Sequence, residues 1–326
     1  MRALITGITG FAGSYLAEHL LEQPGVEVYG WKRWNSPTSN VDHVLERIRM
    51  FDVDIGDPYS VRQSLEQTRP DRIFHLAARS YVPMSFRAPH DAIRVNALGT
   101  LALLEAVRHS DLDPVIHVCS SSEVYGQVPE DELPITEDTP LRPQSPYGVS
   151  KVAEDLVAYQ YHMSYGLRIV RSRAFTHVGA RGRDLVAMPA FARQIAEIEL
   201  GLRKDPVIRV GNLDSTRTFA HARDIASAYW LLTEHGKEGD VYNIAGQHTC
   251  TIREMLDALI ALSDVRPRIE VDPELVRPSD VTRQVADVSK FQRATGWEPE
   301  VSFESTVAEV LDYWRGQVSR AADGRR

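Results

Sequence analysis

The sequence predicts an α/β fold in which a doubly wound parallel sheet is combined with a smaller, interleaved α+β domain. Short apolar, β-rich runs alternate with longer helical patterns through the first half of the chain. A glycine-rich turn separates the first such run from the first helical pattern, and beyond Thr176 the alternation loosens. Because strand–helix alternation requires right-handed crossovers, helices should cover both faces of the sheet, as in a Rossmann-type fold.

We expect strands at five apolar runs, Arg2–Thr6, Val26–Gly30, Arg72–Leu76, Val115–Val118 and Leu167–Arg171. Helical periodicity separates them over Ala12–Glu22, Val61–Gln67, Ala92–His109 and Tyr147–Tyr165. A helix near Pro189–Leu200, a strand near Val207–Val210 and a helix over Asp224–Glu234 should follow. We therefore expect a Rossmann domain of residues 1–175 plus about 220–245, and a substrate-binding domain of residues 176–219 and 246–326.

Composition and charge exclude several classes of protein. Of the 326 residues, 43% are hydrophobic and 25% charged, which is typical of a globular chain. The net charge of −8 offers no overall basic surface to nucleic acid. No apolar run approaches the ~18 residues that span a membrane, and the start lacks the features of a signal peptide. Cys119 and Cys250 are too few for a disulfide framework, and no Cys/His spacing fits a metal site. We therefore expect a cytoplasmic protein without a bound metal.

Gly7, Gly10 and Gly13 follow the first strand and open the first helix. Glycine suits such a turn because a pyrophosphate must approach backbone N–H groups at the helix N-terminus. The spacing G-x-x-G-x-x-G differs from the more familiar G-x-G-x-x-G, and a merely structural turn is the alternative. Its place between strand and helix favours a dinucleotide site. Asp54 and Ile55, after the third strand, would then hold the adenine edge, unless Asp54 is a solvated turn residue.

The segment after the second strand bears on which dinucleotide is bound. NAD-preferring folds place a carboxylate there for the ribose 2′-hydroxyl, whereas a cation accommodates the 2′-phosphate of NADP. Here the segment reads Gly-Trp-Lys-Arg-Trp, with Lys32 and Arg33 at its centre and no carboxylate before Asp42. This favours NADP over NAD. The alternative is that both cations belong to a solvated loop.

Tyr147 and Lys151 lie four residues apart at the start of a predicted helix, so both side chains project from one face. An ammonium one turn away lowers the pKa of a tyrosine from ~10 toward working pH, which yields a proton acceptor for a sugar or alcohol hydroxyl. An exposed lysine beside a core tyrosine is the alternative for the pair alone. Ser120–Ser122, at the end of the strand Val115–Val118, favours catalysis because substrates bind at that edge of such sheets.

Glu123 follows these serines and distinguishes between two kinds of chemistry. A dehydrogenase, reductase or 4-epimerase needs only the Ser, Tyr and Lys. An additional carboxylate can remove a proton made acidic by a neighbouring new ketone and then assist loss of a hydroxyl. The alternative is a capping or salt-bridged glutamate.

Together these residues resemble the extended short-chain dehydrogenase/reductase family over nearly the whole chain. The characteristic pieces are Thr-Gly-Ile-Thr-Gly-Phe-Ala-Gly at the start, His75-Leu76-Ala77-Ala78, Asn96 in Val-Asn-Ala-Leu-Gly-Thr, and the Tyr147/Lys151 pair. Within that family the chain is most similar to the GDP-mannose 4,6-dehydratases and the neighbouring GDP-4-keto-6-deoxymannose reductases. The likeness lies in the loop from Lys32 to His43, in Ser120–Glu123 and in Gly211–Arg217.

The resemblance implies roles for individual residues. The catalytic set would be Ser121, Glu123, Tyr147 and Lys151, with Ser121 where these dehydratases commonly carry Thr. The implied cofactor site comprises Gly7, Gly10, Phe11, Ala12, Gly13, Lys32, Arg33, Asp54, Ile55, Leu76, Ala77, Ala78, Asn96, Tyr147 and Lys151. The implied substrate site comprises Ser80, Ser122, Thr176, Arg193, Asn212, Arg217, Arg277 and Asp280. Arg217 and the segment from Arg277 to Asp280 would hold the diphosphate and ribose, because an arginine fork suits phosphate. A surface pair of Arg217 with Asp214 or Asp224 is the alternative.

The activity implied by the resemblance is that of a GDP-mannose 4,6-dehydratase, which oxidises C4 with NADP, eliminates water across C5 and C6 and returns the hydride to C6. An NAD(P)H-dependent 4-keto sugar reductase is the alternative, as is a dehydratase or epimerase of another nucleotide sugar, and NAD is the alternative cofactor. The partner would be a nucleotide sugar, in a homodimer or homotetramer, with no nucleic acid or membrane. Two departures bear on these sites: Thr176 stands where the family often has Asn, and Trp34 where these dehydratases often carry a further Arg.

Overall fold

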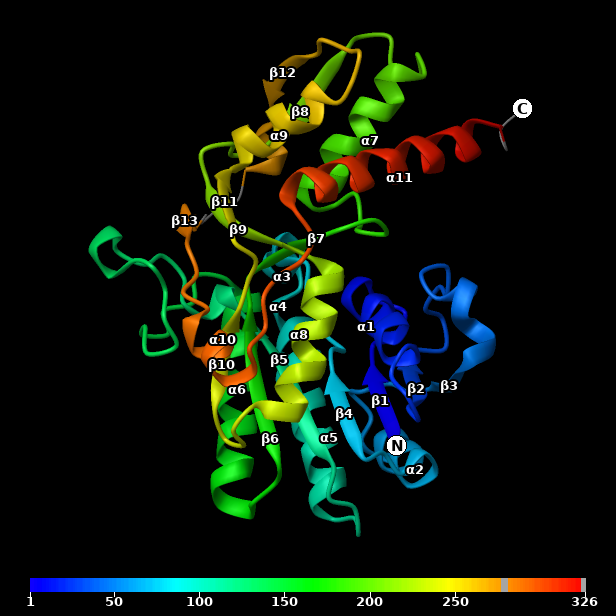
Figure 1. The fold of residues 1–326 in the computed structure, drawn as a ribbon, viewed down its shortest axis with the longest axis vertical. Helices are drawn as coiled ribbons and strands as arrows, with labels where there is room; N and C mark the ends of the chain where they lie inside the picture. Colours follow the sequence, from blue (N-terminus) through cyan, green and yellow to red (C-terminus); the bar gives the residue numbers. More distant parts are fainter. Residues whose placement is uncertain (277–280, 324–326) are drawn as a thin grey trace.

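A computed structural model describes residues 1–276 and 281–323, which form a large parallel sheet with its helices and a smaller second part (Figure 1). The strands of the large sheet are β1 (Arg2–Thr6), β2 (Glu27–Lys32), β3 (Ile48–Asp52), β4 (Arg72–His75), β5 (Val115–Ser121), β6 (Ile169–Ala174) and β10 (Val241–Ile244). They lie in the order β10-β6-β5-β4-β1-β2-β3, and neighbouring strands are parallel throughout. The predicted doubly wound sheet is confirmed.

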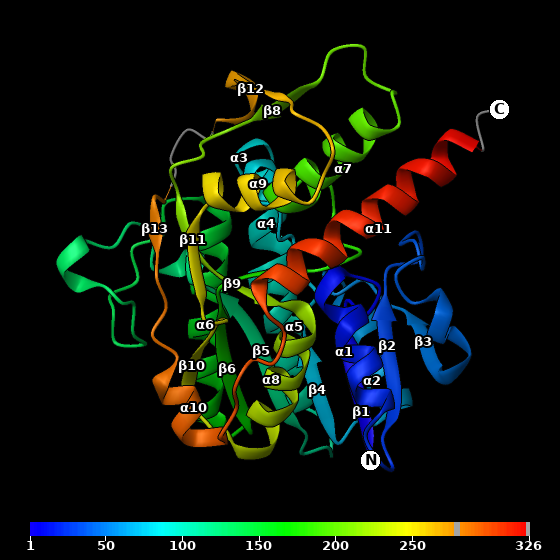
Figure 2. The ribbon, with the colours of Figure 1, turned by 45° about the horizontal axis from the view of Figure 1, so that its top comes forward.

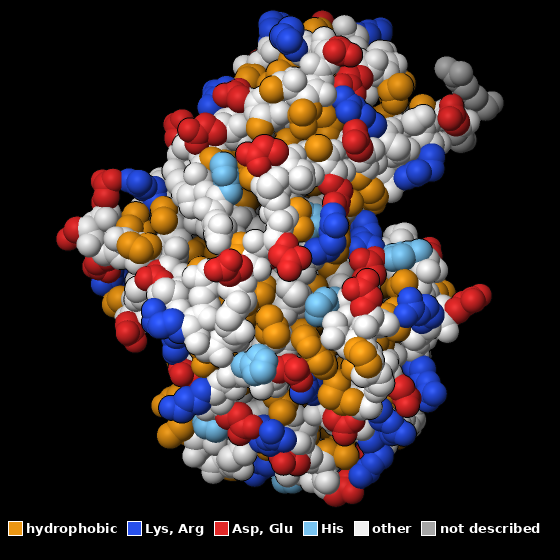
Figure 3. Space-filling view, in the orientation of Figure 1, with side chains coloured by type: hydrophobic (Ala, Val, Ile, Leu, Met, Phe, Trp, Pro, Cys, Tyr) orange, Lys and Arg blue, Asp and Glu red, His pale blue; other side chains and the backbone are white. Residues whose placement is uncertain are grey.

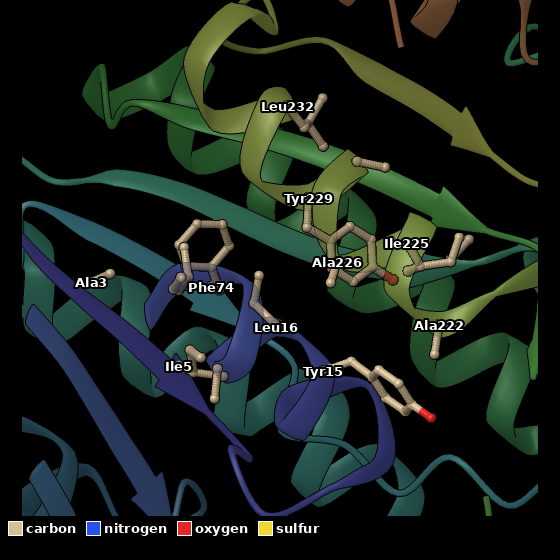
Figure 4. Close-up of a cluster of buried hydrophobic side chains, with 14 of the residues drawn as sticks. Ala3, Ile5, Tyr15, Leu16, Phe74, Ala222, Ile225, Ala226, Tyr229 and Leu232 are labelled. Carbon is tan, nitrogen blue, oxygen red and sulfur yellow. The ribbon is translucent and has the colours of Figure 1, made fainter. Parts of the chain in front are cut away.

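Helices cover both faces of this sheet. The core on one face is built with α1 (Phe11–Leu21), α8 (Ala222–His235) and α10 (Ser289–Thr295); the core on the other is built with α2 (Pro58–Thr68), α5 (Gly99–Arg108) and α6 (Pro146–Tyr165). Figure 4 shows α1 and α8 side by side, with Leu16 and Tyr229 directed into a shared cluster and the Tyr15 hydroxyl pointing out of it. Burial on both faces explains why the strands read as continuous apolar runs rather than as alternating ones.

The local sequence sets where the catalytic helix begins and ends. The Ser145 hydroxyl caps α6 by accepting a hydrogen bond from Gly148 N at 3.0 Å, and Pro146 occupies the first helical position. Gly166 ends the helix in the left-handed region at φ 71°. The backbone N–H of Tyr147 also donates to Ser85 Oγ of α3 (Val82–Arg87) at 3.1 Å. Tyr147 is thereby fixed in the first turn.

One predicted helix differs from its expectation. The pattern over Ala92–His109 predicts a single helix, but the structure has α4 (Pro89–Ile93), a π-helical turn (Arg94–Leu98) and α5. Apolar periodicity does not reveal an inserted residue of this kind, because the pattern resumes beyond it. The π turn carries Asn96, whose contacts are described below, and such turns are frequent at functional sites.

The second part is built around β9 and is interleaved with the first (Figure 2). A sheet of β7 (Thr176–Val178), β9 (Thr216–His221), β11 (His248–Thr251) and β13 (Arg283–Gln284) is joined by the pair β8 (Val207–Val210) and β12 (Arg268–Val271). Its core is closed by α7 (Ala187–Glu199), α9 (Ile252–Ala261) and α11 (Phe303–Asp323). Short 3₁₀ helices cover Asp42–Arg47, Ser122–Val124, Glu130–Glu132 and Pro273–Leu275.

The sequence-based boundary at residue 246 places α10 with the substrate-binding part. In the structure Phe291 of α10 is buried in the core that the large sheet forms with α1 and α8, so this helix lies with the Rossmann part. Among the described residues no helix is long and apolar enough to cross a membrane. On the face in Figure 3, acidic and basic side chains are interspersed.

Candidate active site

The strand order reverses at β1, where β2 and β3 extend the sheet to one side and β4, β5 and β6 to the other. In open α/β sheets, ligands bind outside the carboxyl ends of the strands at such a switch point. The glycine turn follows β1, Leu76–Ala78 follows β4, and Ser121–Glu123 spans the end of β5. The topology therefore brings the predicted cofactor and catalytic segments to the same edge of the sheet.

The glycine turn has the geometry that a pyrophosphate requires. Gly7 adopts φ +74°, and an added Cβ there would stand 3.0 Å from the Ala77 Cα of the neighbouring loop. At Gly13 an added Cβ would stand 2.5 Å from the Gly7 carbonyl oxygen, so the helix packs directly on the turn. Gly10 is the N-cap of α1, and no side chain caps that end. Backbone N–H groups at a helix N-terminus attract phosphate, and these residues fit a dinucleotide.

A chain of buried hydrogen bonds fixes the two loops at the switch point. Thr6 Oγ1 accepts from the backbone N–H groups of Leu76 and Ala77, each at 3.1 Å, and lies 2.8 Å from His75 Nδ1. Thr100 Oγ1 donates to the Asn96 carbonyl at 2.6 Å, so His75 Nε2 donates to Thr100 at 2.9 Å and its Nδ1 accepts from Thr6. Burial, aided by the Lys151 charge, lowers the pKa of His75 to about 3, so the ring is neutral. The roles of Thr6 and Thr100 were not predicted from the sequence, because isolated threonines form no recognisable motif.

Asn96 holds the loop after β4 against the catalytic helix. Its Oδ1 accepts from Arg79 N at 2.7 Å and its Nδ2 donates to Ser150 Oγ at 2.8 Å. Ser150 in turn donates to the Tyr147 carbonyl at 2.7 Å. Asn96 is fully buried, so the structure places this predicted cofactor residue as a support behind the site.

The two cations after β2 have different surroundings. Lys32 is paired with Asp52 of β3 at 2.5 Å. Arg33 is exposed, and within residues 1–276 and 281–323 its side chain has no ion pair or hydrogen bond. Arg33 is thus the cation available to a 2′-phosphate, whereas Lys32 is already neutralised. On the adenine side Asp54 accepts from Gly56 N at 2.9 Å, as a turn aspartate does, and Ile55 is buried.

Tyr147 and Lys151 are both buried and lie under the end of β5. Lys151 Nζ donates to the Cys119 carbonyl and to Glu154 Oε2, each at 2.7 Å. Burial raises the pKa of Tyr147 to about 12, although the Lys151 charge and a hydrogen bond with Ser121 oppose it. The expected lowering of this pKa is therefore wrong for the protein alone, because sequence spacing shows the ammonium but not the depth of burial. Burial lowers the pKa of Lys151, but Glu154 and Tyr147 raise it by more, so the ammonium stays charged.

Ser121 and Glu123 approach the first turn of α6. Ser121 Oγ accepts from Glu123 N at 3.2 Å, which directs the chain into a 3₁₀ turn. The Glu123 carbonyl lies so close to α6 that a Cβ at Gly148 would stand 2.8 Å from it. The Glu123 side chain is half-buried, and among the described residues its carboxylate has no ion pair or hydrogen bond, which disfavours the salt-bridge interpretation. The described residues hold no group of three or more His, Cys, Asp and Glu that suits a metal ion.

The predicted substrate residues are more scattered. Ser80 is exposed in the loop after β4, Thr176 is half-buried in β7, and Ser122 bonds the amide of Gln284. Asn212 Nδ2 donates to Ser215 Oγ at 3.1 Å. Arg277 and Asp280 lie outside the described residues.

Arg217 and Arg193 differ in how they are held. Arg217 is buried in β9 and donates to the Val281 carbonyl at 2.6 Å. Arg193 of α7 forms ion pairs with Asp184 and Glu197 on the surface. Neither arrangement by itself identifies a phosphate site.

His177 is a further residue of this region, and the spacing of the sequence did not assign it to the site. Its ring stacks on Phe11, the first residue of α1, with centroids 5.9 Å apart and planes 6° apart. Burial lowers the pKa of His177, which keeps the ring neutral beside the glycine turn. His177 thus forms part of the wall between the cofactor turn and the second part.

The chain is similar to dehydratases and to reductases of one family. A family model described as GDP-mannose 4,6 dehydratase matches residues 4–310. The GDP-6-deoxy-D-mannose reductase of Pseudomonas aeruginosa is 32% identical, over 97% of this chain and 98% of its own length. The GDP-mannose 4,6-dehydratase of Yersinia enterocolitica is 33% identical, over 95% of this chain and 92% of its own. A solved structure of RMD from P. aeruginosa complexed with NADPH superimposes with a TM-score of 0.84 at 32% identity, covering 97% of this chain and 99% of that one.

Proposed function

Because the chain belongs to the GDP-mannose 4,6-dehydratase family of extended short-chain dehydrogenases/reductases, we propose that it converts GDP-D-mannose to GDP-4-keto-6-deoxy-D-mannose with NADP. The observation that carries this proposal is the half-buried Glu123 carboxylate, which has no protein partner among the described residues. Glu123 belongs to the turn whose backbone bonds Ser121 and approaches the first turn of α6, which carries Tyr147. A carboxylate left free in that position is what removal of a proton from C5 requires.

The cofactor would be held by the glycine turn, with Arg33 at its 2′-phosphate. Bound NADP would take the hydride of C4 and return it to C6, and while oxidised it would supply a positive charge in addition to that of Lys151. A solved relative that contains NADPH is consistent with this choice, and NAD, which a UDP-glucose 4-epimerase of similar fold contains, is the alternative.

Each protein side chain then has one task. Tyr147 accepts the proton of the C4 hydroxyl, Ser121 hydrogen-bonds that oxygen, and Lys151 stabilises the tyrosinate. The resulting C4 ketone acidifies the C5 hydrogen. Glu123 takes that proton and passes it to the departing C6 hydroxyl, which leaves as water. Elimination leaves a C5=C6 double bond conjugated with the C4 ketone, and the hydride that left C4 adds to C6. C5 of the resulting enolate takes a proton from solvent, and Tyr147 returns to solvent the proton that it accepted from the C4 hydroxyl. Atoms and electrons therefore balance without an added reductant.

The test is a Glu123→Gln variant incubated with GDP-mannose in D₂O and analysed by mass spectrometry. The wild type should produce a sugar nucleotide that has lost one water and carries deuterium. The variant should form this product at least about a hundredfold more slowly, the usual effect of removing a general base. Glu132→Gln is the matched control, because Glu132 is exposed in the neighbouring loop and, among the residues that the structure describes, its side chain pairs with Arg142 alone, 3.5 Å away. Wild-type turnover in Glu123→Gln would overturn the proposal.

A second candidate is an NADPH-dependent GDP-4-keto-6-deoxymannose reductase. It is favoured by the length match, since the chain covers 98% of the P. aeruginosa reductase but 92% and 88% of two dehydratases. Incubation of the protein with GDP-mannose and no added cofactor separates the two activities. Loss of water favours the dehydratase, whereas stoichiometric oxidation of NADPH only with the 4-keto compound favours the reductase.

We also propose that the chain forms a homo-oligomer through α6. Val149, Leu156, Tyr159 and Met163 are exposed and lie at helical spacings that place them on one face of this helix. Apolar side chains gathered on a helix face are typical of a protein interface. Light scattering should give a mass of at least two chains, and Leu156→Glu should reduce it.

A further inference from the structure

The ammonium of Lys151 is held by two acceptors that lie below Tyr147. One is the Cys119 carbonyl of β5 and the other is the Glu154 carboxylate, one turn further along α6. The side chains of Lys151 and Glu154 are 4% and 1% exposed, so this ion pair is sealed from solvent. Of the three ammonium protons, two are thereby committed, and one is left to act on Tyr147 and a ligand.

Glu154 is the carboxyl group that faces Lys151 in the described part of the chain. Burial raises its pKa to about 7, although the Lys151 charge opposes this, so it is an anion above that pH. The other titratable groups around the pair are Cys119 and His117 on β5, His75 on β4, Tyr229 on α8 and Asp155 on α6. Burial raises the pKa of the Cys119 thiol and of the Tyr229 phenol and lowers that of both histidines to about 3, so all four are neutral.

The remaining group, Asp155, is directed to other partners. Its carboxylate pairs with Arg171 and with Arg173, the latter at 2.8 Å, both on β6. Two adjacent residues of one helix therefore have buried carboxylates that contact different groups. Asp155 joins the helix to the sheet, whereas Glu154 contacts the catalytic lysine.

The pair is costly as a purely structural device. Glu154 Oε1 is buried and has no hydrogen-bond partner in residues 1–276 and 281–323, and an unsatisfied buried acceptor destabilises a fold. A buried ion pair also often contributes less to stability than apolar residues of similar size. Stability alone does not account for this carboxylate.

We propose that Glu154 is a positioning residue, which holds the Lys151 ammonium beneath Tyr147 and sets how strongly that ammonium favours the tyrosinate. The inference rests on the proposed function only for the roles of Tyr147 and Lys151.

The sign of the effect follows from the charges. The Glu154 anion opposes ionisation of Tyr147 and partly cancels the effect of Lys151. Without it, the ammonium acts on Tyr147 unopposed, and ionisation of the phenol moves to lower pH. Lys151 simultaneously loses the group that raises its pKa, so its deprotonation also moves to lower pH. Both limbs of a pH–rate profile should then move in the same direction.

The experiment compares Glu154→Gln with Asp155→Asn in the full-length protein loaded with NADP. We expect Glu154→Gln to move both limbs of the kcat profile down by about one pH unit, the scale of one charge acting over several ångströms at a dielectric constant near 20. Asp155→Asn should lower thermal stability and leave both limbs in place. Glu154→Asp, which keeps the charge, should return the limbs toward those of the wild type.

A readout without substrate separates failure of this inference from failure of the proposed function. In protein carrying ¹³C-labelled tyrosine, the Tyr147 Cζ resonance, assigned with Tyr147→Phe, should titrate at lower pH in Glu154→Gln. If that variant does not fold, wild-type protein labelled with ¹³C at both tyrosine and glutamate gives a second measurement. The pH titration curves of Tyr147 Cζ and of the Glu154 carboxyl carbon should then share an inflection. Unmoved limbs together with an unmoved Tyr147 titration, or a wild type without a shared inflection, overturn the inference whatever the substrate proves to be.

Discussion

The cofactor part and the substrate part of the molecule are held in place by different kinds of interaction. Around the glycine turn the geometry is set by the backbone and by buried groups, as at Gly13 and Asn96. In the second part a predicted phosphate ligand, Arg193, has a side chain that is 46% exposed and already paired with two carboxylates. The glycine turn is preformed, whereas Arg193 would have to leave its protein partners in order to bind a ligand. Sites of the first kind leave motifs in a sequence because few residue types fit them.

The two parts meet through ionic and aromatic contacts around α1. Arg181, from the loop after β7, lies over the Tyr15 ring at 4.0 Å and pairs with Glu18. Glu309 of α11 lies 3.2 Å from His221 Nε2 at the start of α8 and also pairs with Arg223. Glu18, Glu309 and Arg223 are partly exposed in these contacts, so the contacts should respond to pH and salt more than either core does.

The largest expected effect comes from a substitution at the glycine turn, where close backbone packing, and not helix propensity, should decide the change in stability. Gly13→Ala places a Cβ 2.5 Å from the Gly7 carbonyl, and we expect it to cost about 3 kcal/mol of stability and at least about tenfold in NADP affinity. Calorimetric titration and thermal unfolding measure the two losses.

Gly316→Ala is the matched control, since Gly316 is also helical but an added Cβ would come no nearer than 3.7 Å to another group. This change should stabilise the protein by up to about 1 kcal/mol. Equal losses from both substitutions would show that the turn is not tightly packed and would remove the contrast between the two parts.

An intermediate effect concerns the contact between the parts. Burial opposes ionisation of Glu309, but His221 and Arg223 outweigh it and lower its pKa from 4.5 to about 2. A depressed carboxyl pKa stabilises the fold fully above pH 4.5, and the stabilisation is lost as pH falls toward 2. We expect this to contribute about 1–2 kcal/mol, reduced by partial exposure. Urea unfolding at pH 7 and pH 3 should therefore show a larger loss for wild type than for Glu309→Gln; equal losses would contradict the assignment.

The same contrast explains what the sequence could and could not predict. The sheet, its crossovers and the segments at its carboxyl edge followed from strand–helix alternation and from Gly7, Gly10 and Gly13, and they are confirmed. The π turn at Arg94–Leu98 and the place of α10 did not follow, because both depend on tertiary contacts that no local period records. Likewise Lys32 and Arg33 read as equivalent cations until Asp52 is seen to neutralise one of them. The depth at which Tyr147 is buried, and hence the direction of its pKa shift, is also a property of the assembled fold.

The smallest expected change in stability tests whether the substrate part is assembled by exchange of partners. Arg193→Ala removes two exposed ion pairs, and such pairs contribute little, so unfolding should shift by less than about 1 kcal/mol. If Arg193 leaves Asp184 and Glu197 to bind the diphosphate, the same variant should raise KM for the nucleotide sugar by about tenfold or more and leave kcat little changed. The reason is that a charge-assisted hydrogen bond to phosphate contributes about 1.5–3 kcal/mol. Arg203→Ala is the control, because Arg203 also pairs with Glu197, at 2.7 Å, and is not among the predicted ligands. A similar KM for both variants would mean that Arg193 serves α7 alone, and contact with a diphosphate would then fall to the other predicted ligands, of which the buried guanidinium of Arg217 is as preformed as the glycine turn.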